Sequence, residues 1–339
     1  ASVPHRRGAA MTTGRMLWFD ANRVCAAAGV VLIHSTTDFA GRPFPDADVA
    51  ERAVPVLLRS IGEFSGSEMF FLFSLFLMAQ LSQIKTWVAY LLLGKAQYHM
   101  HFLPTLFAIF LFYPVMRLAM RYPMLGVLLV ATLGAMNHAQ GFLYAIDLAP
   151  LTRDYLVRVT KVCGYVGYGL AAFGLYSLWK DGLPRGESRL IRRGALYLVL
   201  LAYLATLPFY GGALLTGSFP VRAGWDYYGH FLMPLLVFCA FLGSQYSDWS
   251  PRWSVMARYT FGVYLVHPAV IDLFDIALIK TDLALSPALL VVTRFAVVLP
   301  VAFGLAVAIG RLPAVAWTIG LGPTPWAARK ARPQPGAVP

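Results

Sequence analysis

The stretch Trp18-Phe-Asp-Ala-Asn-Arg-Val-Cys-Ala-Ala-Ala-Gly-Val-Val-Leu-Ile-His34 decides how this chain folds. It is too apolar for a surface helix, yet it contains Arg23 and His34, and ionisable groups in such a segment indicate function by default. Eleven helical steps of about 100° return to within roughly 20° of the starting direction, and the rise places the two side chains roughly 16 Å apart. The stretch therefore predicts a membrane helix that carries a cation near one membrane surface and, on the same face, an imidazole well inside.

The composition of the whole chain places it in a membrane. Hydrophobic residues make up 58% of the sequence and charged residues 13%, about half the charge of a soluble domain. Apolar runs close to the roughly 20 residues that cross a bilayer recur along the chain, without the alternation of outer-membrane strands. We therefore predict an all-α, polytopic helical membrane protein. The expected spans are residues 17–38, 57–79, 101–119, 124–145, 159–179, 194–215, 229–246, 255–278 and 287–310.

The net charge of +12 is distributed unevenly between the connections. Alternate connections are basic, and the others hold most of the acids, so the positive-inside rule places the basic set and both termini in the cytoplasm. This pattern fits a bilayer as the partner and argues against nucleic acid. The basic connections contain Arg6, Arg7, Arg15 and Arg23, Arg117 and Arg121, Lys180, Arg185, Arg189, Arg192 and Arg193, Arg252 and Arg258, and Arg311, Arg329, Lys330 and Arg332. The acidic connections contain Asp38, Asp46, Asp48, Glu51, Asp147, Asp154, Asp272, Asp275 and Asp282.

The chain divides into a cytoplasmic N-terminal segment (residues 1–16), a membrane domain (17–312) and a cytoplasmic tail rich in proline and arginine (313–339). We find no signal-peptide pattern at the N-terminus. The spans at 57–79 and 101–119 must run in the same direction, so the segment between them has to cross the membrane. Either residues 84–94 cross as a thin or re-entrant segment, or a crossing is missing from the sequence between Ala79 and Gln80. We favour the second alternative, which gives about ten transmembrane helices.

Carboxylates accompany both ionisable residues of the first helix. Asp20 lies three residues before Arg23 and Asp38 four residues after His34, spacings that place partners on one helical face. A carboxylate beside an imidazole fixes its tautomer and raises its basicity, which prepares a general base. An interfacial ion pair is the structural alternative for Asp20 and Arg23.

Three further groups of polar residues lie in or beside apolar segments. Glu68 and Ser74 belong to the second span, where a carboxylate needs a partner or an aqueous cavity. His99 and His101 precede the third span; at i, i+2 they do not share a helix face, so we expect no metal site and consider sugar stacking or an interfacial belt. His267 follows Tyr264 and precedes a helix-bending proline, with helix packing as its structural alternative.

Taken together, these residues resemble the acyltransferase-3 family of membrane acyltransferases. The family pattern in the first helix is an aspartate, an arginine, ten residues and a histidine. A Phe-Phe-x-x-Ser-Gly-Phe element follows in the second helix, an aromatic-Phe-Leu start with a later Tyr-Pro comes next, and a Tyr-Leu-x-His-Pro element lies near the end. The matching residues are Asp20, Arg23 and His34, then Phe70, Phe71, Ser74 and Phe76 with Leu75 in place of the glycine, then His101-Phe102-Leu103 and Tyr113-Pro114, and finally Tyr264 to Pro268.

The resemblance implies transfer of an acyl group, commonly acetyl, from cytoplasmic acyl-CoA to a cell-envelope polysaccharide or lipid-linked sugar at a bacterial inner membrane. An extended pantetheine arm is on the order of the 16 Å from Arg23 to His34. Arg23, paired with Asp20, would hold a CoA phosphate, and His34 would deprotonate the acceptor hydroxyl. Candidate roles for the other residues are support of His34 (Asp38), catalysis beside it (Glu68, Ser74) and acceptor binding (His99, His101, Tyr264, His267).

Two alternatives stay open at the level of sequence. An acyl-enzyme on Ser74 is compatible with the residues but nothing demands it. A transporter or flippase of lipid-linked sugars could use the same polar residues as a conduction path, although no internal repeat is evident. Assembly of the chain into a homo-oligomer is also left open.

Overall fold

The computed structural model describes residues 16–39, 41–65, 108–124, 142–220, 225–281 and 283–322, together with residues 69, 72, 76, 106 and 126. These residues form helices and connecting turns without a strand, which confirms the all-helical class. Three of the described helices are long and apolar enough to cross a membrane: α9 (Arg185–Thr216), α12 (Thr260–Thr281) and α13 (Pro287–Arg311). The chain is a helical membrane protein, and the expected count of about ten spans extends beyond what the described residues contain.

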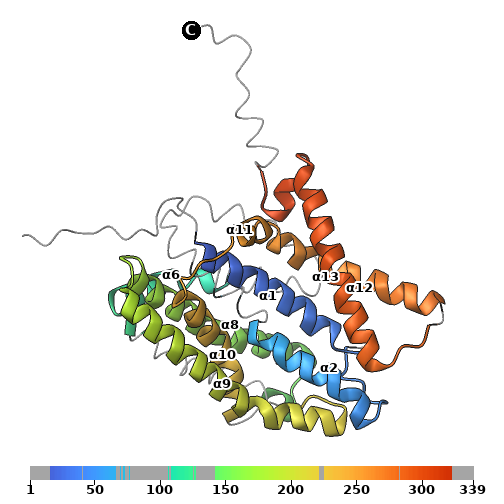
Figure 1. Cartoon of the computed structure of the whole chain (residues 1–339). Coiled ribbons are helices and arrows are strands. Elements are labelled where there is room, and N and C mark those ends of the chain that lie inside the picture. The colour runs from blue at the N-terminus through green and yellow to red at the C-terminus, as the bar shows by residue number, and fades with distance from the viewer. Residues whose placement is uncertain are drawn as a thin grey trace, which may run out of the picture.

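The first helix, α1 (Leu17–Ser35), lies in the middle of the described fold (Figure 1). It contacts α2 (Val49–Gly62), α10 (Trp225–Leu242), α11 (Arg252–Ala257), α12 and α13. Its small and apolar side chains let these neighbours approach closely, as is usual where membrane helices pack. Helix α8 (Pro150–Trp179) packs against α6 (Tyr113–Arg121), and α9 packs along α10. The helix predicted to decide the fold is therefore surrounded by the others.

Aromatic side chains join the start of α1 to two later helices. The Trp18 ring lies 6.0 Å from Trp179 of α8 and 5.7 Å from Phe238 of α10, measured between ring centroids in edge-on arrangements. Phe76 lies among them, 6.1 Å from Trp18, and is fully buried. Such edge-on pairs add roughly 0.5–1.5 kcal/mol each beyond the area that they bury. This cluster anchors the end of α1 that carries Arg23.

The helix boundaries differ from the predicted spans where tertiary contacts intervene. The second predicted span, 57–79, is interrupted: α2 begins at Val49, where Asp48 caps it by accepting from the Glu51 backbone N–H at 2.8 Å, and ends at Gly62 before a 3₁₀ turn (Glu63–Ser65). The predicted span 255–278 is divided into α11 and α12. The described part of span 101–119 contains a turn at Leu111 and Phe112, after which α6 starts. The missing crossing expected after Ala79 lies outside the described residues.

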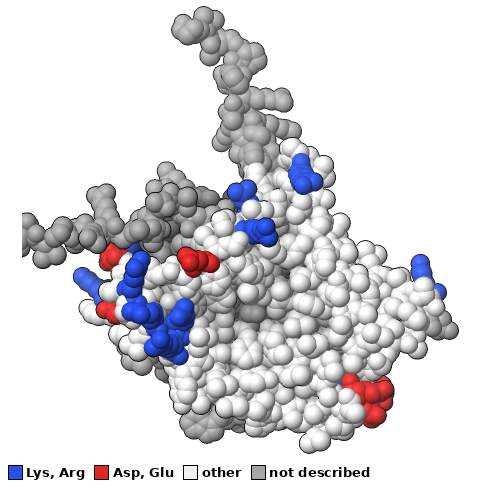
Figure 2. Space-filling view, in the orientation of Figure 1, with Lys and Arg blue, Asp and Glu red and all other residues white. Residues whose placement is uncertain are grey.

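Charged side chains gather at the margins of the visible face of the molecule (Figure 2). Basic groups, with acidic groups among them, lie over the start of α9, near α11 and at the end of α13, and a further acidic group lies near the start of α2, where Asp46, Asp48 and Glu51 are exposed. Lys280, in the last turn of α12, lies apart from the basic groups. A wide uncharged band lies between the two ends, as a bilayer-spanning surface requires.

The close contact between α9 and α10 generates a prediction. A Cβ atom at Gly229 would lie 2.5 Å from the Ala202 backbone oxygen and 3.2 Å from Ala205 Cβ. A Cβ atom at Gly211 would have no heavy atom within 4 Å. We expect Gly229→Ala to destabilise the fold by roughly 1–3 kcal/mol through overpacking. The melting temperature in detergent, followed by tryptophan fluorescence, measures the effect.

Gly211→Ala is the matched control, because it adds the same methyl group to α9 in open space and improves helix propensity. Its melting temperature should equal or exceed that of the unmodified protein. Equal melting temperatures for the two variants would show that the α9–α10 contact is looser than described.

Candidate functional site

Arg23 and His34 belong to one unbroken helix, α1, as the sequence predicts. Their separation along the axis is therefore fixed by the helical rise at roughly 16 Å. Ala27 and Val30 lie between them on the same face and are only 1% and 2% exposed, within the main hydrophobic core. The face that joins the two residues is therefore closed by packing in this conformation.

Arg23 lies near the start of α1, where a second helix orders its carboxylate partner. Its guanidinium is 3.8 Å from Asp20, and its side chain is 26% exposed. Asp20 is buried and accepts a 2.6 Å hydrogen bond from the Ser254 hydroxyl of α11. Because Ser254 holds the carboxylate, Asp20 can orient Arg23, whose side chain is partly exposed. A guanidinium that is partly exposed in this way can hydrogen-bond a phosphate-sized anion.

His34 lies in the last turn of α1 with its side chain exposed in the described fold, and its depth in the membrane stays a prediction. Its ring centroid is 5.3 Å from that of His267 in α12. His267 is 1% exposed, and its ring lies 6.0 Å from that of Tyr264. The packing of α1 on α12 therefore brings three residues that the sequence singles out into one place, with His34 facing outward and the other two buried behind it.

Pro268 explains how His267 is held. Proline has no N–H, so the carbonyl of Tyr264, four residues earlier, lacks its usual helical donor. His267 Nδ1 lies 2.9 Å from that carbonyl oxygen and 3.2 Å from that of Val263. Carbonyl oxygens only accept hydrogen bonds, so Nδ1 carries a hydrogen and, in the neutral ring, Nε2 carries the lone pair. The Tyr-Leu-Val-His-Pro element therefore repairs its own helix and fixes an imidazole.

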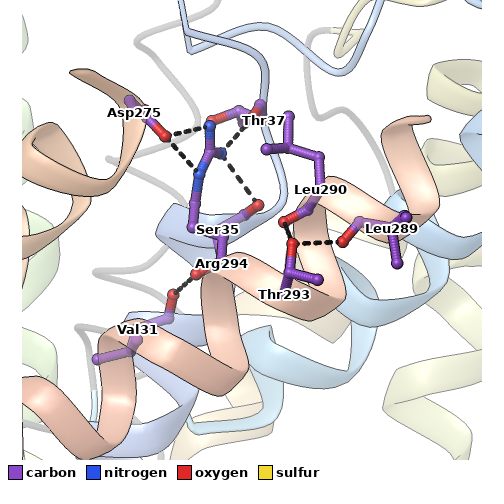
Figure 3. A network of polar contacts seen from close by, with 8 residues as sticks. All are labelled: Val31, Ser35, Thr37, Asp275, Leu289, Leu290, Thr293 and Arg294. Atoms are coloured by element: carbon purple, nitrogen blue, oxygen red, sulfur yellow. Dashed lines mark hydrogen bonds and ion pairs between the residues drawn. The ribbon is translucent and has the colours of Figure 1, made fainter. Parts of the chain in front are cut away.

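Arg294, a residue that sequence reasoning missed, closes the end of α1 (Figure 3). This α13 side chain is 1% exposed. Its Nε and Nη2 lie 3.0 and 2.9 Å from one carboxylate oxygen of Asp275 in α12. Its Nη1 donates to the backbone carbonyls of Ser35 at 3.2 Å and Thr37 at 2.6 Å. One guanidinium thus ties α12 and α13 to the two residues that flank the turn directly after His34.

Asp38 is placed differently from the prediction. Helix α1 ends at Ser35, so the i, i+4 spacing from His34 is not a helical one. The Asp38 carboxylate instead accepts from the backbone N–H of Arg42 at 2.7 Å and from its Nε at 2.9 Å. Asp38 therefore organises the turn after α1, and the reason for assigning it to His34 by spacing was wrong.

The remaining predicted site residues, Glu68, Ser74, His99 and His101, lie outside the described residues. The signal that could have revealed Arg294 is present in the sequence, because a lone arginine interrupts an otherwise apolar run of α13. Ser254 carries no such signal, since a serine in a polar connection is ordinary.

The imidazole of His34 is exposed and lies beside the buried imidazole of His267. The backbone next to His34 is held by Arg294. An imidazole of this kind can accept a proton from a hydroxyl brought within hydrogen-bond reach. At the other end of the same helix, an ordered arginine can bind an anion. The site therefore combines a candidate general base, His34, and a candidate anion-binding residue, Arg23, on one helix.

Comparison with protein-family models gives one family for this chain. A model described as an acyltransferase domain, Acyl_transf_3, matches residues 57–311, a range that begins within α2 and contains α12 and α13. Searches of curated proteins and of solved structures find no match.

The buried Arg294–Asp275 pair generates a second prediction. Asp275→Asn would leave the Arg294 charge buried without its counterion, which typically costs about 3–5 kcal/mol. We expect a large fall in the melting temperature of the detergent-solubilised protein. Asp181→Asn serves as the control, because its pair with Lys180 is exposed and such pairs contribute little. A similar melting temperature for both variants would show that the Arg294–Asp275 pair does not stabilise the fold.

Proposed function

This chain belongs to the acyltransferase-3 family of membrane acyltransferases, and we propose that it moves an acyl group, most simply acetyl, from acyl-CoA to a sugar hydroxyl. The acceptor class that we propose is a cell-envelope polysaccharide or lipid-linked saccharide. The observation that carries the proposal is the exposed His34 at the end of α1, backed by His267 and aligned with Arg23 on one helix.

His34 acts as the general base in this proposal. Its imidazole removes the proton from the acceptor hydroxyl as the hydroxyl oxygen attacks the thioester carbonyl. A carbon–oxygen bond forms, the carbon–sulfur bond breaks, and the leaving thiolate takes up the proton from His34 to give free CoA. Direct transfer needs no covalent enzyme intermediate. An acyl-enzyme on Ser74 would be the two-step alternative.

Arg23 binds the donor. Its partly exposed guanidinium, ordered by Asp20 and Ser254, offers charge-assisted hydrogen bonds to a CoA phosphate. The thioester would then lie toward His34. Since Ala27 and Val30 are buried on the face between them, the donor arm enters only when the neighbouring segments part from this face. We therefore propose that donor binding is coupled to an opening of the packing around α1.

His267 and Tyr264 act behind His34. Both side chains are nearly buried, at 1% and 7% exposed. This burial favours a role in supporting the His34 ring over the direct acceptor contact expected from sequence. Acceptor binding by His99 and His101, and catalysis by Glu68, Ser74 or Asp38, are proposed from the sequence alone.

The remaining parts of the proposal concern the surroundings. We propose a bacterial inner membrane with both termini in the cytoplasm, because basic residues gather in alternate connections of the sequence. The partners are acyl-CoA, the acceptor and the bilayer, without a metal or nucleic acid. A transporter of lipid-linked sugars is not favoured, because the family model that matches describes an acyltransferase domain.

Removal of the proposed base tests the reaction. His34→Ala in membranes supplied with radiolabelled acetyl-CoA should reduce acyl incorporation into glycan by about 10²–10⁴-fold, the usual contribution of a positioned base. Cys25→Ala on the same helix is the control and should retain full incorporation. Undiminished incorporation in the His34 variant would exclude this residue as the base.

Removal of the proposed donor contact gives a different kinetic result. Arg23→Ala should raise the apparent KM for acetyl-CoA by about 10- to 150-fold, because a charge-assisted hydrogen bond contributes roughly 1.5–3 kcal/mol. The turnover number at saturating donor should change much less. Initial rates over a range of acetyl-CoA concentrations provide the measurement, and an unchanged donor dependence would remove the role given to Arg23.

A further inference from the structure

A buried ionic cluster lies at the end of α2 and has no part in the function proposed so far. Its centre is Glu63, which is 6% exposed. Arg59 Nε lies 3.2 Å from one carboxylate oxygen of Glu63, and His230 Nδ1 lies 3.1 Å from the other. The Tyr210 hydroxyl donates to the same oxygen as His230. The four residues come from α2, its 3₁₀ extension, α9 and α10, so the cluster joins three parts of the bundle.

The cluster reaches α1 through Arg59. Its Nη1 donates to the backbone carbonyl of Ile33 at 3.4 Å, one residue before His34. The other side of the guanidinium is covered by the Phe219 ring, 4.4 Å from its carbon to the ring centroid. Close packing supports the contact, because a Cβ atom at Gly62 would lie 3.0 Å from the Ile33 side chain and 3.3 Å from the Gly29 carbonyl.

The contact between Arg59 and Ile33 lies in the last turn of α1. The last carbonyls of a helix have no partner within the helix, and cations near them are favourable. The Ile33 carbonyl accepts from Arg59 in addition to the backbone N–H and the hydroxyl of Thr36, whereas Arg294 donates to the carbonyls of Ser35 and Thr37. His34 therefore lies between two carbonyls, each bound to an arginine from a different helix. A carboxylate, Glu63 or Asp275, pairs with each of these arginines.

We propose that Arg59, held by Glu63, is a positioning residue that fixes the backbone of His34 from the α2 side. Glu63 orients the guanidinium, while Tyr210 and His230 hold the carboxylate. The inference rests on the proposed function, because it assigns this cluster to the base of that reaction. A misplacement of the base by about 1 Å can lower the rate on the order of 10²-fold, so a fixed helix end has a direct catalytic consequence.

Kinetics of matched variants test the assignment. Arg59→Met keeps the length and apolar stem of the side chain but removes the ion pair with Glu63 and the hydrogen bond to Ile33, and Glu63→Gln keeps the shape but removes the charge. Each should lower kcat on the order of 10–100-fold with little change in the KM for acetyl-CoA. Arg59→Lys, which retains a donor cation beside Glu63, should recover part of the loss.

Ser60→Ala is the control for general damage to α2. The Ser60 hydroxyl is buried and joins α2 to α9 through the Tyr203 hydroxyl, at 3.0 Å. This variant should lower the melting temperature in detergent and leave kcat of the folded protein unchanged. The double variant of Arg59 and Glu63 should lose no more than either single variant, because the two residues act as a unit.

Hydrogen–deuterium exchange supplies a readout that does not depend on activity. In Arg59→Met, amide exchange should rise in a peptide covering residues 31–37 and stay unchanged in one covering residues 17–24. Unchanged exchange at the end of α1, or an equal rise in Ser60→Ala, overturns the inference. If His34→Ala keeps full activity, the proposed function fails, and a localised rise in exchange still establishes the contact between Arg59 and α1.

Discussion

The carbonyls at the end of α1 are the constraint on which the rest of the site depends. A helix that ends inside a membrane protein must find donors for these groups, because water is scarce there. Arg294 of α13 donates to the carbonyls of Ser35 and Thr37, and Arg59 of α2 adds a donor at the Ile33 carbonyl, which also accepts from Thr36. Each arginine needs a counterion of its own once buried, which recruits Asp275 of α12 and Glu63. Satisfying one helix end therefore fixes the relative positions of four helices around His34.

The same logic operates inside α12. Pro268 removes a backbone donor, and the imidazole of His267 replaces it at the Tyr264 carbonyl. The repair fixes the hydrogen of the ring on Nδ1 and leaves Nε2 as the basic nitrogen of the neutral form. A sequence element that looks like a helix distortion is thus also a means of presenting a defined imidazole to His34. The hydrogen bond from His267 to the Tyr264 carbonyl therefore both stabilises α12 and orients the imidazole.

Helix packing also covers the face of α1 between Arg23 and His34. Arg23 and His34 share a face, yet Ala27 and Val30 between them are buried, so an extended donor cannot lie along that face in the conformation described. The aromatic cluster around Trp18 holds the Arg23 end, and the two arginines hold the His34 end. Both ends of α1 are therefore fixed, so the opening that we propose for donor entry would have to come from the segments packed against its middle.

The sequence by itself determined the features that depend on local spacing and on composition. Apolar runs indicated a helical membrane protein, the ten residues between Arg23 and His34 placed both on one face, and the order of short motifs indicated the family. Only the tertiary structure decided where α1 ends, that Asp38 pairs with Arg42, and that the predicted second span breaks after Gly62. It also decided that Asp20 meets Ser254 and that Arg294 meets Ser35, more than 200 residues apart in each case. The reason is physical: periodicity records which face of a helix is apolar, whereas these polar contacts depend on which helices become neighbours.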